Sequence, residues 1–274
     1  MKNRLFTVLL TAAVFGLGSA VNAAEISDAE AMKAISAVVL PAMEKNQIPG
    51  MAVALVLGDK TYVLNYGVSD VEKQTPVTDE TIFEIGSISK TFTVTLATHA
   101  EATGKLKLTD TAASYLPELA GTDFGNLQLF HLGTHTLGGI PLQVPDEVQT
   151  REQLLEYLRT WKPAYKTGTM RTYANPSIGA LGWITAKSLG QDFSTAMTQT
   201  IFQPLGLTST YLSIPAQKMS SYAWGYNKDK KPVRVNPGML DSEAYGIKTT
   251  ASDLSTFLKA NMGMLPLDSM LQAA

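Results

Sequence analysis

The sequence predicts a mixed α/β (α+β) fold in which a sheet is flanked by helices and carries an inserted, mostly helical domain. Two short apolar runs of strand character, residues 51–57 and 62–66, stand near the start of the chain. Helical patterns interrupted by Gly and Pro then continue to about residue 209. Strands followed by a long run of helices are typical of this fold class. The hydrophobic fraction, 45% of 274 residues, is large enough for a packed core.

Each element follows from its own local pattern. Residues 27–45 favour a helix because Ser27 or Asp28 can cap its first turn. The segment 48–50 (IPG) is a turn, and the two apolar runs flank Gly58-Asp59, which predicts a β-hairpin. Later helices are predicted over three further segments, namely 91–101, 192–201 and 252–262.

Charge and composition exclude several classes of protein. The chain has 22 Lys+Arg and 24 Asp+Glu, a formal net charge of −2, and only 17% charged residues. No Lys/Arg stripe supplies the attraction for phosphates that nucleic-acid binding needs, so no nucleic-acid partner is expected. Because there is no cysteine, disulfide scaffolds, cysteine-ligated metal sites and cysteine nucleophiles are excluded.

The N-terminal segment has the features of a secretory signal peptide. Lys2 and Arg4 precede the apolar run 5–17, and the small-residue segment 21–23 (VNA) follows. The apolar run is too short to span a bilayer, and no later run is longer, so no membrane association is expected after cleavage. We therefore expect residues 1–23 to be removed after Ala23 and the mature protein to be periplasmic.

Ser87 and Lys90 form a Ser-x-x-Lys motif within the segment 83–90 (FEIGSISK). A serine hydroxyl is a poor nucleophile until a base takes its proton. On a helix, residues three apart lie on one face, so Lys90 would stand beside Ser87. The motif is short and occurs by chance, and the alternative is an ordinary helix start capped by a serine.

Tyr173 and Asn175 form a second candidate, Tyr-Ala-Asn. A tyrosine of ordinary pKa, about 10, is not a base at neutral pH, but a nearby ammonium such as that of Lys90 favours its phenolate. Tyr173 could then take the Ser87 proton and later activate a water. The Asn175 amide can bind a substrate amide or hold Lys90. Taken alone, the tripeptide is more often a surface loop with a half-buried tyrosine.

Other motifs are weaker. The segment 166–168 (KTG) belongs, in serine acyl-transfer enzymes, on a strand beside the nucleophile, whereas here it lies in a loop marked by Pro and Gly. His131 and His135 have a metal-binding spacing but no third ligand, so both are expected to be packing or capping residues. His99 stands alone on an apolar helical pattern and is expected to be a core or surface residue without a catalytic role. No Gly-x-Ser-x-Gly elbow for a Ser–His–Asp triad surrounds Ser87.

With these residues in place, the chain resembles the class C serine β-lactamases, the cephalosporinases. The resemblance covers essentially the whole of the sequence after residue 23. It is carried by five segments: 48–54 (IPGMAVA), 83–90 (FEIGSISK), 137–148 (LGGIPLQVPDEV), 222–226 (YAWGY) and 237–246 (PGMLDSEAYG). It implies the serine β-lactamase/transpeptidase-like fold.

The resemblance also implies a mechanism and the roles of the site residues. Ser87 is the acylated nucleophile, and Lys90 with Tyr173 is the proton-transfer pair. Gln143 and Asn175 contact the amide side chain of the lactam, and Tyr245 lines the edge of the pocket. The substrates are penicillins and cephalosporins, hydrolysis confers antibiotic resistance, and no metal or organic cofactor is implied.

One departure from the family concerns the end of the sequence. The family's Lys-Thr-Gly strand follows the Tyr-x-Asn loop, whereas this sequence reaches Ala274 first. We therefore expect a C-terminally incomplete chain without the last strands, the second oxyanion N–H and the carboxylate-binding groups, and with little lactam turnover. The expected domains are the signal at 1–23, an N-terminal part of the α/β domain at 24–103, and a mostly helical part at 104–274 that begins the return to the α/β domain.

Two alternative functions remain open. The same four residues, Ser87, Lys90, Tyr173 and Asn175, suit a related serine D-Ala-D-Ala peptidase or esterase. A penicillin-binding sensor would be acylated at Ser87 without turnover. A monomer is expected because no heptad seam or interface patch is evident.

Overall fold

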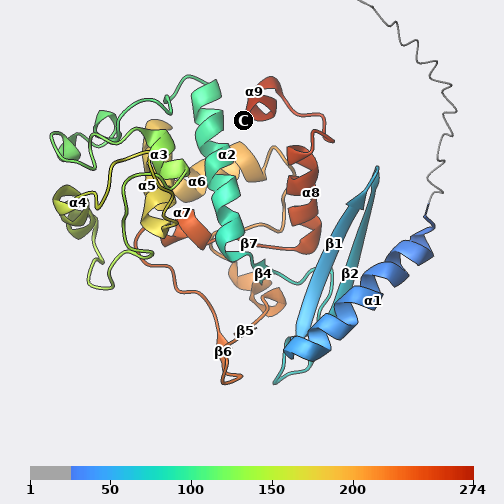
Figure 1. The fold of residues 1–274 in the computed structure, drawn as a ribbon. Helices are drawn as coiled ribbons and strands as arrows, with labels where there is room; N and C mark the ends of the chain where they lie inside the picture. Colours follow the sequence, from blue (N-terminus) through green and yellow to red (C-terminus); the bar gives the residue numbers. More distant parts are fainter. Residues whose placement is uncertain (1–25) are drawn as a thin grey trace, which may run out of the picture. The chain divides into compact units, whose positions relative to one another are not determined.

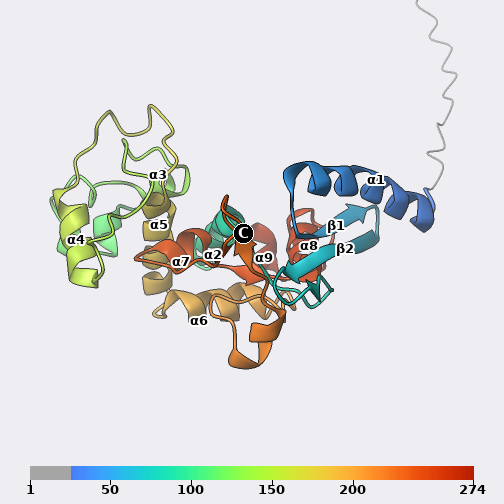
Figure 2. The same ribbon diagram turned by 90° about the horizontal axis from the view of Figure 1, so that it is seen from below.

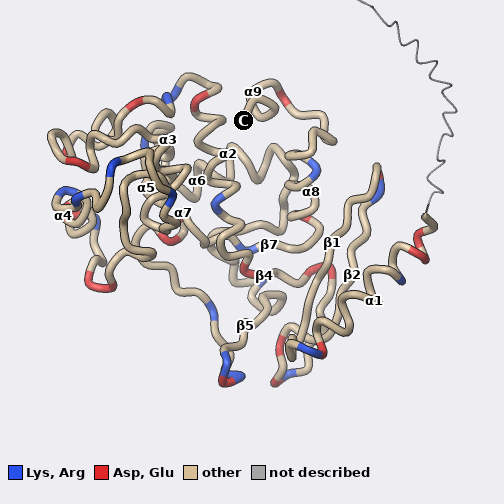
Figure 3. The backbone as a smooth tube through the Cα atoms, in the orientation of Figure 1, with Lys and Arg blue, Asp and Glu red and all other residues tan. Residues whose placement is uncertain are grey.

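A computed structural model describes residues 26–274, so the expected signal peptide lies outside the described residues. The chain divides into two compact units, residues 1–40 and 41–274, and helix α1 (Asp28–Asn46) spans their boundary. The domain division expected at residues 103–104 stays a prediction. In the described part of the chain, no helix is both long and apolar enough to cross a membrane. Figure 3 shows basic and acidic residues scattered along the described backbone.

The predicted hairpin is confirmed. Strands β1 (Gly50–Leu57) and β2 (Lys60–Asp70) pair antiparallel from Gly50↔Gly67 to Leu57↔Lys60. The two-residue loop begins at Gly58, whose φ of 60° is readily adopted only by glycine and a few polar residues. Strand β2 also pairs with β3 (Thr75–Pro76), which gives the order β1-β2-β3 and leaves β1 at the edge of this sheet among the described strands.

Two further strand pairs are short. Strand β4 (Phe83–Glu84) pairs antiparallel with β7 (Lys248–Thr249), which brings the chain before Ser87 against a segment about 160 residues later in the sequence. Strand β5 (Gly225–Tyr226) pairs with β6 (Pro232–Val233).

Helices connected by loops are the main regular elements of the remainder, as predicted, and Figure 1 shows them from α2 to α9. Thr150 caps α4 in a full capping box with Gln153, and Asp192 caps α6. The predicted helix over 192–201 changes to a π-helical turn, η4, after five residues. The α-helices are α2 (Ser89–Ala102), α3 (Leu129–Gly133), α4 (Arg151–Thr160), α5 (Asn175–Ser188), α6 (Phe193–Met197), α7 (Asp241–Tyr245), α8 (Ala251–Asn261) and α9 (Ser269–Ala273). The 3₁₀ and π-helical turns are η1 (Gly86–Ile88), η2 (Ala112–Ser114), η3 (Pro117–Leu119), η4 (Thr198–Phe202) and η5 (Ala216–Ser221).

Two apolar clusters hold these helices together. The first surrounds α5, which buries eleven of its fourteen residues among leucines of α3 and α4 such as Leu132 and Leu158. The second surrounds Phe92 of α2, whose ring stacks on Phe257 of α8 at 3.6 Å and meets Phe202 edge-on. Both views in Figures 1 and 2 show α2 between these groups of helices. Helix α2 is thus fixed from two sides by burial of apolar side chains.

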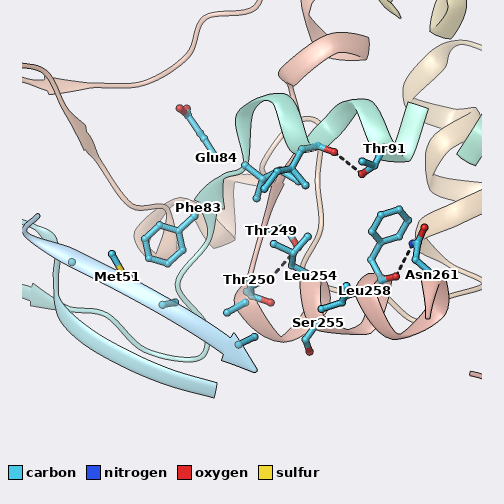
Figure 4. A pocket seen from close by; sticks show the side chains of 17 residues that line it. Met51, Phe83, Glu84, Thr91, Thr249, Thr250, Leu254, Ser255, Leu258 and Asn261 are labelled. Atoms are coloured by element: carbon cyan, nitrogen blue, oxygen red, sulfur yellow. Dashed lines mark hydrogen bonds between the residues drawn. The ribbon is translucent and has the colours of Figure 1, made fainter. Parts of the chain in front are cut away.

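A cavity of about 730 Å³ lies beside β1. Its lining is mostly apolar and comes from β1, from the segment that leads into α2, and from α8 (Figure 4). The apolar residues that contribute are Met51, Ala52, Ala54, Phe83, Ile85, Ile88, Ala251, Leu254, Phe257 and Leu258.

Candidate active site

Ser87 stands in the 3₁₀ turn η1, two residues before α2 begins at Ser89. Gly86 enters the turn with a φ of +52°, a conformation that glycine adopts without strain. The helical turn continues into α2, and residues three apart on a helix lie on one face. Lys90 Nζ accordingly donates a 3.1 Å hydrogen bond to Ser87 Oγ. The side-by-side arrangement predicted from Ser-x-x-Lys is confirmed.

Lys90 is a buried cation held by the backbone of another helix. Its Nζ also donates a 2.9 Å hydrogen bond to the carbonyl of Ala244 in α7, and it lies 4.8 Å from the ring centroid of Tyr173. Burying an ammonium is unfavourable unless hydrogen bonds replace its hydration. These contacts fix the ammonium beside Ser87 and allow it to stay in the protein interior.

Tyr173 approaches the nucleophile from the loop that precedes α5. Its hydroxyl donates a 2.7 Å hydrogen bond to Ser87 Oγ. Burial by itself would raise the pKa of Tyr173, but its hydrogen bonds to Lys90 and Ser87 and the charges of Lys90 and Arg171 together lower it. A phenol with a lowered pKa exchanges a proton more readily at neutral pH. The three predicted catalytic side chains therefore meet at one oxygen atom.

Helix α7 is positioned by α2 and α5 together. Thr93 Oγ1 donates a 2.6 Å hydrogen bond to the carbonyl of Glu243, and Ser89 Oγ accepts one from the N–H of Ile247 at 3.1 Å. On α5, Gly179 and Gly182 leave the room that α7 needs, since a Cβ at Gly179 would lie 2.6 Å from the Leu240 carbonyl oxygen. The Ala244 carbonyl that holds Lys90 is thus fixed by both neighbours of α7.

The three residues expected to bind substrate form a second, connected group. Asn175 Nδ2 donates a 2.9 Å hydrogen bond to Gln143 Oε1, and the Gln143 side chain lies close enough to Tyr245 to influence the pKa of its hydroxyl. Burial and the hydrogen bond to the Asp241 carboxylate raise the pKa of Tyr245, so its hydroxyl stays a neutral donor. Asn175 Oδ1 is buried without a hydrogen-bond partner, which leaves an acceptor available at this end of the site.

The three histidines have different surroundings, and His135 is the one that contacts Tyr173. His131 Nδ1 is 2.9 Å from Thr136 Oγ1, and His99 Nδ1 is buried without a hydrogen-bond partner. His135 is buried against Tyr173, with ring centroids 4.8 Å apart. Among residues 26–274 no group of three or more His, Asp or Glu side chains is placed to hold a metal ion.

The Lys-Thr-Gly triplet lies in a turn, as the sequence indicated. Thr167 Oγ1 donates to the carbonyl of Leu137 at 2.9 Å, and the N–H of Gly168 donates to the carbonyl of Thr136 at 2.8 Å. These bonds anchor the loop on the segment that follows α3.

Sequence reasoning missed the Ala244 carbonyl and the contact of His135 with Tyr173. A backbone carbonyl carries no signature in the sequence, since every residue has one. His135 lies 38 positions before Tyr173, and nothing in its local pattern connects the two. Of the contacts in this site, only the one between Ser87 and Lys90 follows from residue types and spacing alone.

Comparison with known proteins supports one family. A family model described as beta-lactamase matches residues 35–274. The chain is 49% identical over 240 residues to a beta-lactamase of Pseudomonas fluorescens, which covers 88% of this chain and 67% of that protein. Against curated beta-lactamases from five bacteria, the chain spans 58% to 67% of their length.

Solved structures agree with this assignment. A class C beta-lactamase in complex with cefoxitin is 46% identical with a TM-score of 0.87, over 89% of this chain and 69% of that one. A protein described as beta-lactamase/D-alanine carboxypeptidase from Pseudomonas syringae is 48% identical with a TM-score of 0.86, over 88% and 68%. The expected fold is confirmed, and the chain belongs to the beta-lactamase family, within its class C serine branch.

Proposed function

We propose that this chain acts on β-lactams through an acyl-enzyme formed at Ser87. The observation that carries the proposal is the placement of Ser87 Oγ, 3.1 Å from Lys90 Nζ and 2.7 Å from the Tyr173 hydroxyl. A serine with two proton-exchanging neighbours at hydrogen-bond distance is the arrangement that nucleophilic catalysis requires. The cefoxitin complex of a class C relative supports β-lactams as the substrate class.

In the acylation step, Ser87 Oγ attacks the lactam carbonyl carbon and the lactam C–N bond breaks. The Ser87 proton passes to the Tyr173–Lys90 pair and from there to the departing lactam nitrogen. The backbone N–H of Ser87, at the start of a helical turn, donates to the oxygen that gains negative charge. A water that gives its proton to Tyr173 then hydrolyses the ester and releases Ser87.

The second group of residues suits the amide side chain of a lactam. The Asn175 amide both donates and accepts, and its Oδ1 is unpartnered. Gln143 is hydrogen-bonded to Asn175 and lies close to Tyr245, so a substrate amide would replace or extend an existing hydrogen bond. Tyr245 would then border the bound lactam.

The decisive experiment treats the purified chain with a penicillin and with a chromogenic cephalosporin. Intact mass reports an adduct on the protein, and absorbance reports turnover. Ser87→Ala should abolish both signals, whereas Ser194→Ala, an exposed serine on α6, should leave them unchanged. Turnover supports a hydrolase, and a long-lived adduct without turnover supports a penicillin-binding sensor. Absence of both with the parent chain would overturn the proposal.

A second candidate is a D-Ala-D-Ala peptidase, because one solved relative is described as beta-lactamase/D-alanine carboxypeptidase. The same Ser87 would attack a peptide carbonyl in place of a lactam. Comparing rates on a D-Ala-D-Ala peptide, a nitrophenyl ester and a cephalosporin distinguishes the activities. We propose the lactamase activity as the principal one because of the cefoxitin complex.

We also propose that the protein is exported to the periplasm, acts there as a monomer and confers resistance to β-lactams. The basic start, the apolar run at 5–17 and the small residues before Ala24 support export. Cleavage after Ala23 would be seen as a mature N-terminus at Ala24 in protein recovered from cells. Sedimentation tests the oligomeric state, and the inhibitory concentration of a cephalosporin in a susceptible host tests resistance.

A further inference from the structure

Tyr173 differs from the other two catalytic side chains in how it is supported. Ser87 lies in the 3₁₀ turn η1 and Lys90 in the first turn of α2, whereas Tyr173 lies in the irregular segment between α4 and α5. The Tyr173 side chain is 37% exposed. A displacement of about 1 Å at a reacting group can lower a rate about 100-fold, so this loop needs a fixed support.

His135 supports the loop on both sides of Tyr173. Its carbonyl accepts a 2.9 Å hydrogen bond from the N–H of Thr172, and its ring Nδ1 accepts one from the N–H of Ala174 at 3.3 Å. Between these two bonds, the imidazole ring lies against the Tyr173 ring. One residue therefore fixes the backbone before and after Tyr173 and also contacts its side chain.

The backbone of His135 is itself in an unusual conformation. Its φ is +60°, in the left-handed region that non-glycine residues rarely occupy, and its side chain is 5% exposed. Such a conformation persists where the surroundings fix it, and it is concentrated at functional sites. Here the conformation lets the carbonyl and the ring of one residue reach two N–H groups two residues apart.

We propose that His135 is a positioning residue that directs the Tyr173 hydroxyl toward Ser87 and Lys90. This inference rests on the proposed function of Ser87 and adds a residue to it. His135 touches neither the nucleophile nor the expected place of the lactam, and it acts only through Tyr173.

The ring must be neutral to do this, because a protonated imidazole has no acceptor. Burial, with the nearby charges of Arg171 and Lys90, lowers the pKa of His135 to about 4. Those two cations and the Tyr173 phenol are the charged or titratable groups that face the ring. At neutral pH the ring is uncharged, with Nδ1 as the acceptor and the proton on Nε2.

Substitutions at His135 distinguish the contribution of the Nδ1 acceptor from the contribution of the aromatic ring. In His135→Asn the amide oxygen occupies the place of Nδ1, and asparagine tolerates a positive φ. In His135→Gln the acceptor lies one bond further out, and in His135→Phe the ring remains without an acceptor. His131→Asn, at the neighbouring histidine that bonds Thr136, is the matched control.

The readout is the pKa of Tyr173, measured from ultraviolet tyrosinate absorbance as the difference between each protein and its Tyr173→Phe counterpart. We expect the parent, His135→Asn and His131→Asn to share a lowered pKa of Tyr173. In His135→Gln and His135→Phe the pKa should return toward 10. An unchanged pKa of Tyr173 in folded His135→Gln or His135→Phe would overturn the proposal, because a purely structural role would leave it unmoved.

Two further measurements complete the test. Acylation of Ser87, followed by intact mass, should be about 10- to 100-fold slower in His135→Gln than in His135→Asn, with little change in lactam affinity. If the parent forms no adduct, the proposed function fails while the pKa of Tyr173 still decides the role of His135. Nitrogen NMR of the parent ring needs no variant, and protonated Nδ1 at neutral pH would contradict the proposal even where a variant does not fold.

Discussion

The two sides of the nucleophile are built in opposite ways. On the side of α5 and α7, Lys90 is buried and hydrogen-bonded to Ser87 Oγ and to the Ala244 carbonyl. On the side of β1, Ile88 is 48% exposed and borders the mostly apolar cavity. At this one helix start, Lys90 thus lies in a polar environment and Ile88 in an apolar one.

This difference follows from what each side must stabilise. A buried ammonium loses its hydration and needs carbonyl and hydroxyl partners, which is why α7 is placed so accurately against α2 and α5. An apolar wall needs only surface area and shape, because hydrophobic burial is not directional. Proton transfer is therefore organised by the helices, while the hairpin side contributes hydrophobic surface.

The largest expected effect comes from removing the charge on the helical side. Lys90→Met keeps the length of the side chain and deletes the ammonium beside Ser87 and Tyr173. We expect acylation of Ser87 to slow by a factor of about 10²–10⁴, because proton transfer loses its partner. The rate of acylation is measured by following the intact mass of the protein over time. Lys187→Met, a half-exposed lysine of α5, is the control, and equal rates in both variants would place the chemistry elsewhere.

The sequence predicts these two sides unequally. The β-hairpin follows from Gly58-Asp59 between apolar runs, and the contact of Ser87 with Lys90 follows from a spacing of three. The meeting of Ser87 with Tyr173 depended on the family resemblance, since 86 residues separate them. Local patterns specify local geometry, whereas contacts across the fold depend on packing that no single segment encodes.

The parts that sequence reasoning did not reach share a physical cause. The Ala244 carbonyl is a backbone group, and the π-helical turn after Met197 is a local departure from an otherwise helical pattern. His135 has its role only because the loop before α5 folds back onto it. Each depends on how separate elements meet, so periodicity and motif spacing carry no trace of it.

A smaller effect on the acylation rate is expected from disturbing the packing of α7 against α5. Gly179→Ala would place a Cβ 2.6 Å from both the Cβ and the carbonyl oxygen of Leu240, so α7 must move away from α5. Overpacking of this kind destabilises by about 1–3 kcal/mol. Because the Ala244 carbonyl moves with α7, acylation should slow as well. Gly133→Ala, whose Cβ would meet only a Leu181 methyl at 3.2 Å, should change both the unfolding free energy and the rate much less.

The helical side should also give stability a pH dependence through Glu243. Burial and, to a smaller extent, the charge of Asp241 raise the pKa of Glu243 from 4.5 to about 7, although the charge of Arg151 acts in the opposite direction. The folded chain holds this proton more tightly than the unfolded one. The stabilisation is therefore complete below about pH 4.5 and is lost as pH rises through 7.

Glu243→Gln should remove that loss and raise the free energy of unfolding by about 3 kcal/mol at pH 8 relative to the parent. Denaturant unfolding at pH 5 and at pH 8 measures the difference. Glu147→Gln, at an exposed position, should keep the parent's pH dependence. A parent whose stability is the same at both pH values would contradict the raised pKa of Glu243.

The smallest expected effect concerns the hairpin side. Among the described strands β1 is an edge, and exposed apolar edges promote association between copies at high concentration. Ala54→Lys places a charge on β1 at the apolar cavity, where it should reduce association while changing the unfolding free energy by less than about 1 kcal/mol. Thr61→Lys adds the same charge at an exposed position of β2. If light scattering against concentration falls equally for both variants, net charge explains the change. A fall confined to Ala54→Lys locates association at the β1 edge, and it would show that the apolar side of the nucleophile, unlike the polar side, still offers surface for another strand.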